Sequence, residues 1–208
     1  MKSGRQINII SRCTDAVPMV LGVRGLRIRE LEPGDYEELV ALWRRAGLPF
    51  RPRGRDSRRE ILRQLSLPTS VYLKAVVGEG ARPVPAVEAS ARGGAERTGA
   101  GEAGVESNGA VVGRGVGKRE VIVGVILGTH DGRKGWVNRL AVLPEYRRRG
   151  VARALVRELE RRFRRMGIGV FCALVEDWNR VSLKAFRAMG YELHRDIFYF
   201  SKRRSRGA

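Results

Sequence analysis

A strand-like apolar run followed directly by a long amphipathic helix is the feature that most constrains this chain. Residues 136–143 (WVNRLAVL) predict a strand, and Pro144 ends it. Apolar residues then recur at spacings of three and four positions, which predicts a helix with one apolar face that ends at Gly167. These apolar residues are Val151, Leu155, Leu159, Phe163 and Met166. The chain therefore contains a strand–turn–helix unit whose helix is buried along one side.

The junction between this strand and this helix carries several arginines and a glycine. A helix start exposes unpaired backbone N–H groups and about half a positive charge, so it attracts anions. Gly150 lets the backbone approach a ligand closely, and the small Ala152 keeps the next turn uncrowded. The junction therefore predicts a turn that binds a pyrophosphate, with arginines adding charge. The residues of this predicted turn are Arg147, Arg148, Arg149, Gly150, Val151, Ala152 and Arg153.

Further strand and helix patterns flank this unit along the chain. The predicted strands cover 26–33, 71–77, 120–130, 136–143 and 170–175, and the predicted helices cover 35–47, 57–65 and 151–167, with another starting at Asn179. Asp35 is the expected N-cap of the first helix. The nearly continuous β-branched run at 120–130 is typical of a strand covered on both faces. Asp131 and Gly132 then predict a hairpin turn.

Residues 78–118 differ from the rest of the chain. They are mostly Gly, Ala, Val, Glu and Arg, include no aromatic residue and show no helix or strand period. This length and composition are typical of a flexible surface insertion rather than an ordinary loop. We therefore predict an N-terminal extension at 1–22, a single domain at 23–202 interrupted by the insertion, and a basic tail at 203–208. A partner-binding role for the insertion stays open.

The charge balance restricts the classes of partner. Lys and Arg number 41 against 22 Asp and Glu, which gives a formal net charge of +19. Such a surplus suits nucleic acid, an anionic cofactor or an acidic protein surface. Nucleic acid is disfavoured, because no aromatic-rich strand, zinc-ligand spacing or helix-turn-helix pattern accompanies the charge. We expect no metal.

The sequence also bears on the compartment. No apolar run approaches the roughly 20 residues that a membrane span needs, and the N-terminal region shows no secretory cleavage site. Cys13 and Cys172 cannot form a disulfide framework. We therefore expect a soluble, cytoplasmic protein with no membrane partner. The scarcity of Asn and Gln favours a thermophilic source.

Two segments resemble the GNAT superfamily of acyl-CoA-dependent N-acetyltransferases, and within it the ribosomal-protein and N-terminal acetyltransferase-like members. They are NRLAVLPEYRRRGVARALV (138–156) and EDWNRVSLKAFRAMGY (176–191). The order of predicted elements extends the resemblance over 25–202. It implies an α/β (α+β) fold with a mixed, twisted sheet of six or seven strands and helices on both faces. Residues 191–201 would form an edge hairpin, and a homodimer through that region is left open.

The resemblance also implies how acetyl-CoA, with coenzyme A as product, would bind. The free backbone groups of Leu140, Ala141 and Val142 would bind pantetheine, and their N–H groups would polarise the thioester carbonyl. Asn179 would contact the cofactor near its pantetheine arm, and Ser182 shares that helix face. Asn179 is equally explained as a helix N-cap. Phe186 stands where many relatives have a Tyr that protonates the departing thiolate.

Groups for acid–base catalysis are less clear. Some relatives carry a Glu near the start of the motif strand, where this chain has residues 136–138. Glu176 and Asp177 are the nearest candidate carboxylates for the general base, and they are equally explained as charges before a helix N-terminus. Tyr199 or Tyr191 would replace the missing phenol. His130 is a lesser candidate base, better explained as a solvated turn residue.

The predicted activity is therefore transfer of an acetyl group from acetyl-CoA to a primary amine by direct attack in a ternary complex. The acceptor would be a protein N-terminus, a lysine or a small amine. Without a clear base, an α-amine with a pKa near 8 is favoured over a lysine near 10.4, because more of it is neutral. The alternative is a non-catalytic module of the same fold that senses acyl-CoA or associates with nucleic acid.

Overall fold

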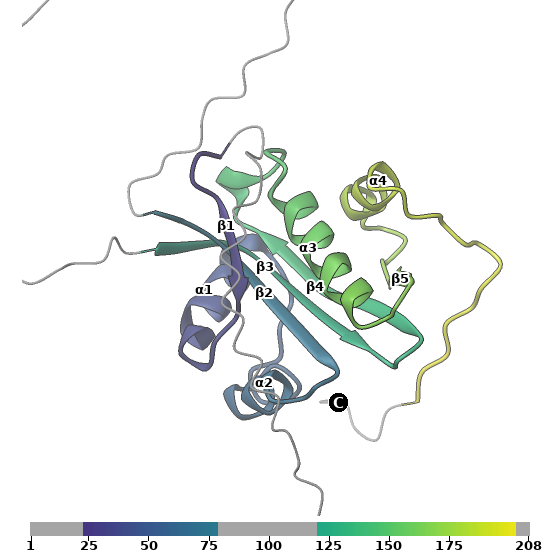
Figure 1. Cartoon of the computed structure of the whole chain (residues 1–208), viewed down its shortest axis with the longest axis horizontal. Helices are drawn as coiled ribbons and strands as arrows, with labels where there is room; N and C mark the ends of the chain where they lie inside the picture. Colours follow the sequence, from purple (N-terminus) through teal and green to yellow (C-terminus); the bar gives the residue numbers. More distant parts are fainter. Residues whose placement is uncertain (1–22, 79–119, 203–208) are drawn as a thin grey trace, which may run out of the picture.

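A computed structural model describes residues 23–78 and 120–202 of the chain. In this part the sheet has five strands in the order β1-β2-β3-β4-β5 (Figure 1). The strands are β1 (Arg27–Glu30), β2 (Ser70–Gly78), β3 (Glu120–His130), β4 (Lys134–Val142) and β5 (Val170–Ala173). The first four are antiparallel neighbours, whereas β5 runs parallel to β4. The long connection through α3 makes the parallel pairing possible, because parallel strands need a crossover.

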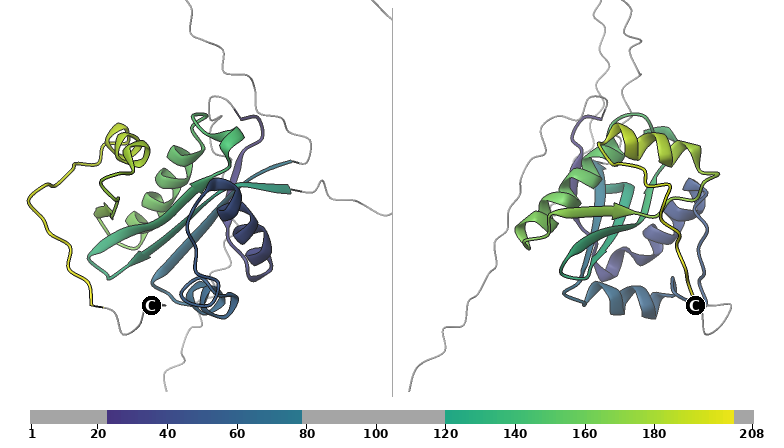
Figure 2. Two further views of the ribbon diagram at one scale, coloured as in Figure 1. Left: turned by 180° about the vertical axis from the view of Figure 1, so that it is seen from behind. Right: turned by 90° about the vertical axis from the view of Figure 1, so that its right-hand side faces the viewer.

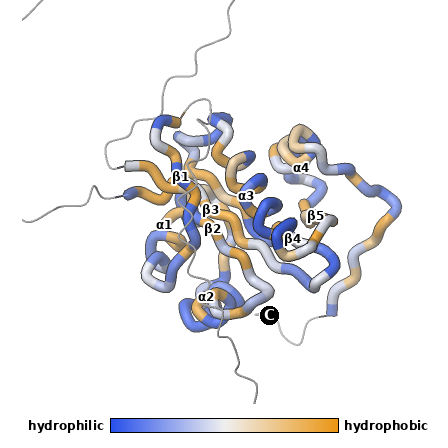
Figure 3. The backbone as a smooth tube through the Cα atoms, viewed as in Figure 1, coloured by the Kyte–Doolittle hydropathy of each residue, from blue (hydrophilic) through white to orange (hydrophobic). Residues whose placement is uncertain are grey.

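The helices cover the two faces of the sheet. They are α1 (Tyr36–Ala46), α2 (Arg58–Leu65), α3 (Val151–Arg165) and α4 (Arg180–Ala188), with short 3-10 turns η1 (Pro33–Asp35) and η2 (Pro144–Tyr146). Helix α3 packs on one face, and α1 and α2 pack on the other (Figures 1 and 2). The central strands are therefore buried on both sides, which explains their continuous apolar runs (Figure 3).

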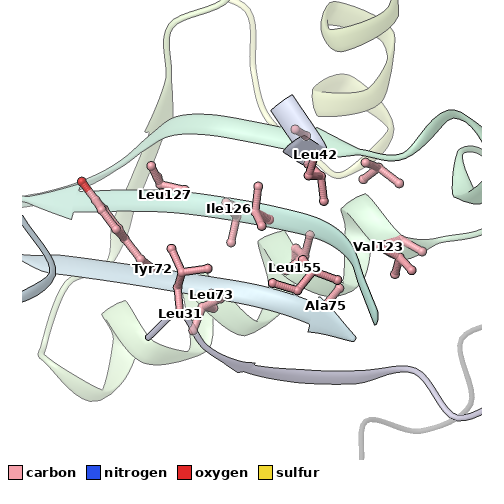
Figure 4. Close-up of a cluster of buried hydrophobic side chains, with 14 of the residues drawn as sticks. Leu31, Leu42, Tyr72, Leu73, Ala75, Val123, Ile126, Leu127 and Leu155 are labelled. Atoms are coloured by element: carbon pink, nitrogen blue, oxygen red, sulfur yellow. The ribbon is translucent and has the colours of Figure 1, made fainter. Parts of the chain in front are cut away.

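The core between α3 and the sheet depends on close packing of α3 side chains against glycines of the strands. Leu155 of α3 and Leu42 of α1 approach the strands from opposite sides (Figure 4). A Cβ atom on Gly128 would lie 2.7 Å from Leu159 Cδ1, and one on Gly135 would lie 2.3 Å from Phe163 Cδ2. A side chain at either position would force Leu159, Phe163 or α3 itself to shift, because interiors are close-packed. The two glycines therefore let α3 lie directly on the sheet.

The face under α1 and α2 contains two ion pairs with little exposure. Lys74 Nζ lies 2.6 and 2.8 Å from the two carboxylate oxygens of Asp35. Arg139 Nη2 lies 2.8 Å from Asp56 Oδ2. Asp35 precedes α1 as predicted, but its side chain makes no capping bond to that helix. Instead its oxygens bind Lys74 and the backbone N–H of Glu32, because the chain enters α1 through η1.

The predicted fold class is confirmed, with corrections to its details. The strand count falls short of six or seven, because residues 191–201 form no strand in the described part of the chain. After Tyr191, which packs against the core, this segment leaves α4 as an extended, exposed run (Figure 1). Its apolar and polar residues alternate as in a strand. Alternation alone does not supply the neighbouring strand with which its backbone would form hydrogen bonds. Met166 is 50% exposed, because α3 ends at Arg165 before its last predicted apolar position.

The predicted domain limits are only partly covered. The extension at 1–22, the tail at 203–208 and the insertion at 78–118 lie outside the described residues, except for Gly78 at the end of β2. The strands on either side of the insertion, β2 and β3, are antiparallel neighbours. No helix within 23–78 and 120–202 has the length and hydropathy to cross a bilayer.

Candidate functional site

Strand β4 loses its parallel partner halfway along its length. Its pairing with β5 ends at Val137 and Ala173, whereas β4 continues to Val142. On the other side, the register with β3 passes from Val137 opposite Gly128 to Arg139 opposite Leu127, so Asn138 is an extra residue. Such a bulge bends a strand and re-aims its side chains. The edge of β4 from 138 to 142 is therefore uncovered by β5.

The turn after β4 presents backbone N–H groups. Arg148 and Gly150 both adopt positive φ angles, 56° and 84°, and Gly150 is the N-cap of α3. The first bond of the helix runs from Ala154 N to Gly150 O at 2.9 Å. The N–H groups of residues 151–153 precede that bond and have no acceptor within the helix. With the dipole of a 15-residue helix behind them, these groups form an anion site.

The β4 edge and this turn open into one large cavity of about 1310 Å³, which we call the main cavity. It extends between α3 and α4 and reaches the residues after α1. Nearly all of the predicted cofactor-binding residues line it. They are Leu140, Ala141, Val142, Arg147, Arg148, Gly150, Val151, Ala152, Arg153, Asn179 and Ser182. The structure thus gathers residues from β4, the turn and α4 around one space.

Two predicted cofactor-binding residues lie outside the main cavity. Arg149 Nε donates to the carbonyl oxygen of Glu145 at 3.0 Å, which directs its guanidinium toward η2. Phe186 is 8% exposed and packs edge-to-face on Tyr191, with ring centroids 5.0 Å apart. Phe186 therefore belongs to the apolar core.

The arginines of the main cavity differ in what they bind. Arg147 donates to the carbonyl oxygens of Val142 at 3.1 Å and Ala46 at 2.7 Å, so it ties β4 to the end of α1. By contrast, Arg148 and Arg157 make no hydrogen bond or ion pair with any residue in the described ranges. These two guanidinium groups are available to an anion.

The single carboxylate among the lining residues within 23–78 and 120–202 is Glu158. Burial opposes its ionisation, but hydrogen bonds from Arg161 and Arg162 outweigh that effect and lower its pKa. Glu158 is therefore ionised and paired, which makes it a poor proton acceptor. The main cavity is strongly positive overall.

Asn179 caps α4 and also faces the main cavity. Its Oδ1 accepts a hydrogen bond from Ser182 N at 3.1 Å, which confirms the N-cap prediction. Its Nδ2 has no partner among the described residues. Asn179 can therefore cap the helix and donate to a ligand at the same time.

The predicted catalytic side chains are not gathered at the main cavity. Glu176 and Asp177 are exposed between β5 and α4 and do not line it. Tyr199 is 71% exposed on the segment after α4 and does not line it either.

The two lesser candidates are engaged elsewhere. His130 Nδ1 accepts from Gly132 N at 3.3 Å, and its Nε2 lies 3.2 Å from the carbonyl oxygen of Pro68. Tyr191 donates to Glu160 Oε1 at 2.9 Å, and burial with that neighbouring carboxylate raises its pKa. Both groups therefore stabilise local structure.

Among the lining residues of the main cavity that sequence reasoning missed are Arg157 and Trp178. Arg157 lies four positions after Arg153 on α3, so the helical repeat places both on one side. That spacing was the available signal, but an exposed arginine stripe looks the same whether or not it borders a cavity. Trp178 precedes Asn179 directly, and its exposed ring carries no pattern of its own.

A second, smaller cavity of about 450 Å³ lies on the opposite face of the sheet, under α2. Its lining residues come from α2 and the segments on either side of it, and from β2, β3 and β4. They are Arg55, Asp56, Ile61, Arg63, Gln64, Leu67, Thr69, Ser70, Tyr72, Leu127, Thr129, Asn138 and Arg139. Burial raises the pKa of Tyr72 to about 12, and its hydroxyl donates to Gln64 Oε1. We call this space the α2 cavity.

The donor groups needed for a metal site are dispersed in the described part of the chain. No group of three or more His, Cys, Asp or Glu side chains there is placed to hold an ion.

Known proteins share this architecture. A family model described as acetyltransferase (GNAT) family matches residues 83–191. An aminoglycoside antibiotic 6'-N-acetyltransferase from Acinetobacter baumannii superposes with a TM-score of 0.56 at 15% identity, covering 87% of this chain and 100% of its own. A PaiA N-acetyltransferase from Thermoplasma acidophilum, in complex with coenzyme A, gives 0.55 at 17%, covering 82% and 91%.

A ribosomal-protein-alanine N-acetyltransferase from Brucella melitensis gives a TM-score of 0.51 at 14% identity and covers 86% of this chain and 99% of its own. At these identities the likeness to solved structures concerns the fold alone. The family match spans more than half of the sequence and includes β3, β4, the turn and α3.

Proposed function

Because the chain belongs to the acetyltransferase (GNAT) family, we propose that it transfers the acetyl group of acetyl-CoA to a primary amine, with a protein N-terminal α-amine as the preferred acceptor. The amine nitrogen forms a bond to the acetyl carbon, the carbon–sulfur bond breaks, coenzyme A leaves as the thiolate and the amine gives up one proton. Acetyl-CoA supplies the activated acyl group. The protein's residues bind it, orient it and select the amine.

One observation carries the proposal. The left-handed Gly150 turn at the start of α3 and the two unpartnered guanidinium groups of Arg148 and Arg157 border the same cavity. Coenzyme A carries a diphosphate and a ribose phosphate, so it offers anions to both a backbone N–H cradle and separate cations. The amides of 151–153 suit the diphosphate, and the arginines suit the remaining charge.

The uncovered edge of β4 suits the amide-bearing pantetheine arm. Peptide groups between Leu140 and Val142 border the main cavity and have no β5 partner. Strand edges bind extended amide-containing ligands through their free N–H and C=O groups. The Nδ2 of Asn179 adds a donor from the opposite wall. N–H groups at this edge would also stabilise charge that develops on the thioester carbonyl oxygen.

The acceptor preference follows from proton chemistry. The carboxylate of Glu158 is held by two arginines, so among the described residues the main cavity offers no free base. An amine that is already partly neutral needs no strong base, and an α-amine with a pKa near 8 meets this condition far better than a lysine near 10.4. Solvent water can then accept the proton.

The test compares initial rates of acetylation at pH 7.5 with acetyl-CoA. One peptide has a free α-amine and no lysine, and the other has a blocked N-terminus and one lysine. Mass spectrometry should find the acetyl group on the α-amine, at a rate at least about ten-fold above that on lysine, because the neutral fractions differ by about two orders of magnitude. Faster transfer to lysine would overturn the α-amine preference. Binding of acetyl-CoA without transfer to any amine would favour the non-catalytic, acyl-CoA-sensing alternative.

We also propose that the protein works in the cytoplasm, because its cysteines do not suggest a disulfide framework. A homodimer and a thermophilic source stay predictions from sequence alone.

A further inference from the structure

We propose that the α2 cavity binds the acceptor, and that the acceptor is an α-amine with a carboxylate close to it rather than a polycationic amine. This inference rests on the proposed acetyl transfer and names the substrate class for it. It depends on three features: the position of the α2 cavity on β4, the pairing of its charged side chains and one free amide oxygen.

The first feature is the shared strand. Asn138 and Arg139 line the α2 cavity, and Leu140 to Val142 line the main cavity. Adjacent residues of β4 therefore border two separate cavities. The parallel pairing with β5 ends at Val137, just before Asn138, so no β5 ladder closes this stretch. A ligand in the α2 cavity can thus approach the place where β4 borders the donor.

The second feature is the state of the charges. Asp56 is the only carboxylate among the lining residues in the described ranges, and it is 3% exposed. Its Oδ2 accepts from Arg139 Nη2 at 2.8 Å and from the backbone N–H of Arg51 at 2.7 Å. It therefore neutralises Arg139 and has no charge to offer to a ligand. A polyamine would find no counter-ion here and would pay for its own desolvation.

The cations of the α2 cavity are less fully neutralised. Arg63 is bound by Glu60 at 2.6 and 2.9 Å, which satisfies its charge. Arg55, however, lies 3.8 Å from Asp56, which already binds Arg139, and the Arg55 side chain is 53% exposed. The guanidinium of Arg55 can therefore bind a carboxylate at the rim. The sign of the free charge favours an acidic ligand.

The third feature is a place for the amine. Asn138 Nδ2 donates to Thr129 Oγ1 at 2.8 Å, which fixes the amide plane. Its Oδ1 has no hydrogen-bond partner among the described residues, so it can accept from an amine N–H. The amine would bind beside the bulge of β4 and the carboxylate at Arg55.

The test uses two peptides that differ only in charge after the first residue, Ser-Asp-Glu-Ala-Ala-Ala and Ser-Arg-Arg-Ala-Ala-Ala, with free glutamate and spermidine as small-molecule probes. We measure kcat/KM at about 150 mM salt, where long-range attraction is screened. The acidic peptide should exceed the basic one by about ten-fold or more, as expected for one charged hydrogen bond. Spermidine should show no turnover. Turnover of free glutamate would show that the carboxylate of a single residue suffices.

The key variant is Arg55→Glu, with Arg59→Glu as its matched control. Both change the net charge equally, but Arg59 is exposed on α2 and does not line the cavity. Arg55→Glu should lower the acidic-to-basic ratio at least about ten-fold, whereas Arg59→Glu should leave it within about two-fold of the wild-type ratio. Arg55→Gln, which tests the same charge with less perturbation, should give an intermediate ratio.

Equal rates for both peptides with the wild-type protein would overturn the inference and leave acetyl transfer standing. Equal shifts in Arg55→Glu and Arg59→Glu would also overturn it, because the selectivity would then belong to the overall charge. Turnover of spermidine above that of the acidic peptide would contradict it directly. Failure to acetylate any amine would refute the proposed function itself, and with it this inference.

Discussion

The two faces of the sheet are stabilised by different means. On the α3 face, glycines of β3 and β4 receive the side chains of Leu159 and Phe163, and shape decides the fit. On the α1 and α2 face, Lys74 and Arg139 pair with carboxylates that precede α1 and α2. The first arrangement fixes the position of the helix whose start forms the anion site. The ion pairs of the second arrangement place polar groups beside the α2 cavity. Apolar packing alone would not provide such groups.

The largest expected effect concerns the charged face. Replacing Lys74 with Met removes the partner of Asp35 and leaves that carboxylate mostly buried beside β2. Breaking one partner of a buried ion pair destabilises a protein by about 3–5 kcal/mol. Urea unfolding should therefore show that the free energy of unfolding falls by about 3 kcal/mol.

The control for this variant is the double change Lys74→Met and Asp35→Asn. The double variant has no unpaired Asp35 carboxylate but keeps a side-chain oxygen that accepts from the Glu32 N–H. It should therefore recover part of the lost free energy of unfolding. A double variant less stable than Lys74→Met would contradict this account of the charged face.

The packed face predicts the next largest effect. A methyl group on Gly135 would meet the ring of Phe163, so Gly135→Ala should destabilise the protein by about 1–3 kcal/mol. The matched control is Gly78→Ala at the end of β2, where nothing lies within 4 Å of the new atom. Thermal unfolding of both variants separates crowding from the general effect of alanine. Equal melting temperatures would contradict close packing between Gly135 and the Phe163 ring.

The next prediction concerns the two arginines of the main cavity that have no partner in the described residues, Arg148 and Arg157, and their effect on coenzyme A binding. Arg148→Gln and Arg157→Gln should each weaken coenzyme A binding about ten-fold, because each removes a charged hydrogen bond to phosphate. Folding stability should stay unchanged, because neither side chain has a partner to lose in the described residues. Arg187→Gln, exposed on α4 and outside both cavities, is the control for lost charge. An equal loss in Arg187→Gln would contradict a local role.

The smallest expected effect is a pH dependence on the charged face. Burial raises the pKa of Tyr72 to about 12 in the folded protein, against about 10 in the unfolded chain. The stability tied to this neutral phenol is present below pH 10 and is lost as the pH rises from 10 toward 12. Between pH 9 and 11, the free energy of unfolding of the wild type, measured in urea, should therefore fall by about 1 kcal/mol more than that of Tyr72→Phe. Identical losses would show that the phenol is solvated.

The sequence predicted what local patterns determine. The apolar stripe of α3, the strand before it and the turn at Gly150 are encoded within about two dozen neighbouring residues, and periodicity with turn chemistry suffices to find them. The same holds for the Asn179 cap.

Features that depend on distant residues were out of reach. Arg139 and Asp56 are 83 positions apart, so no local pattern announces their pairing or the α2 cavity beside it. The strand expected at 191–201 failed for a similar reason, because alternation gives no information about a partner edge. The proposed roles of Glu176, Asp177 and Tyr199 came from order along the chain, and the structure leaves these side chains exposed outside both cavities.

The central claim is that the backbone turn at Gly150 holds the diphosphate of coenzyme A. Isothermal titration of coenzyme A into Gly150→Asp tests it, with Gly132→Asp as the control, because both glycines have a φ of 84° and the same strain follows from substitution. Gly132 lies in the exposed β3–β4 hairpin, away from the main cavity. The account predicts that Gly150→Asp loses affinity by about a hundred-fold, through charge repulsion and lost backbone approach, while Gly132→Asp binds as wild type does. Equal affinity in both variants would contradict it.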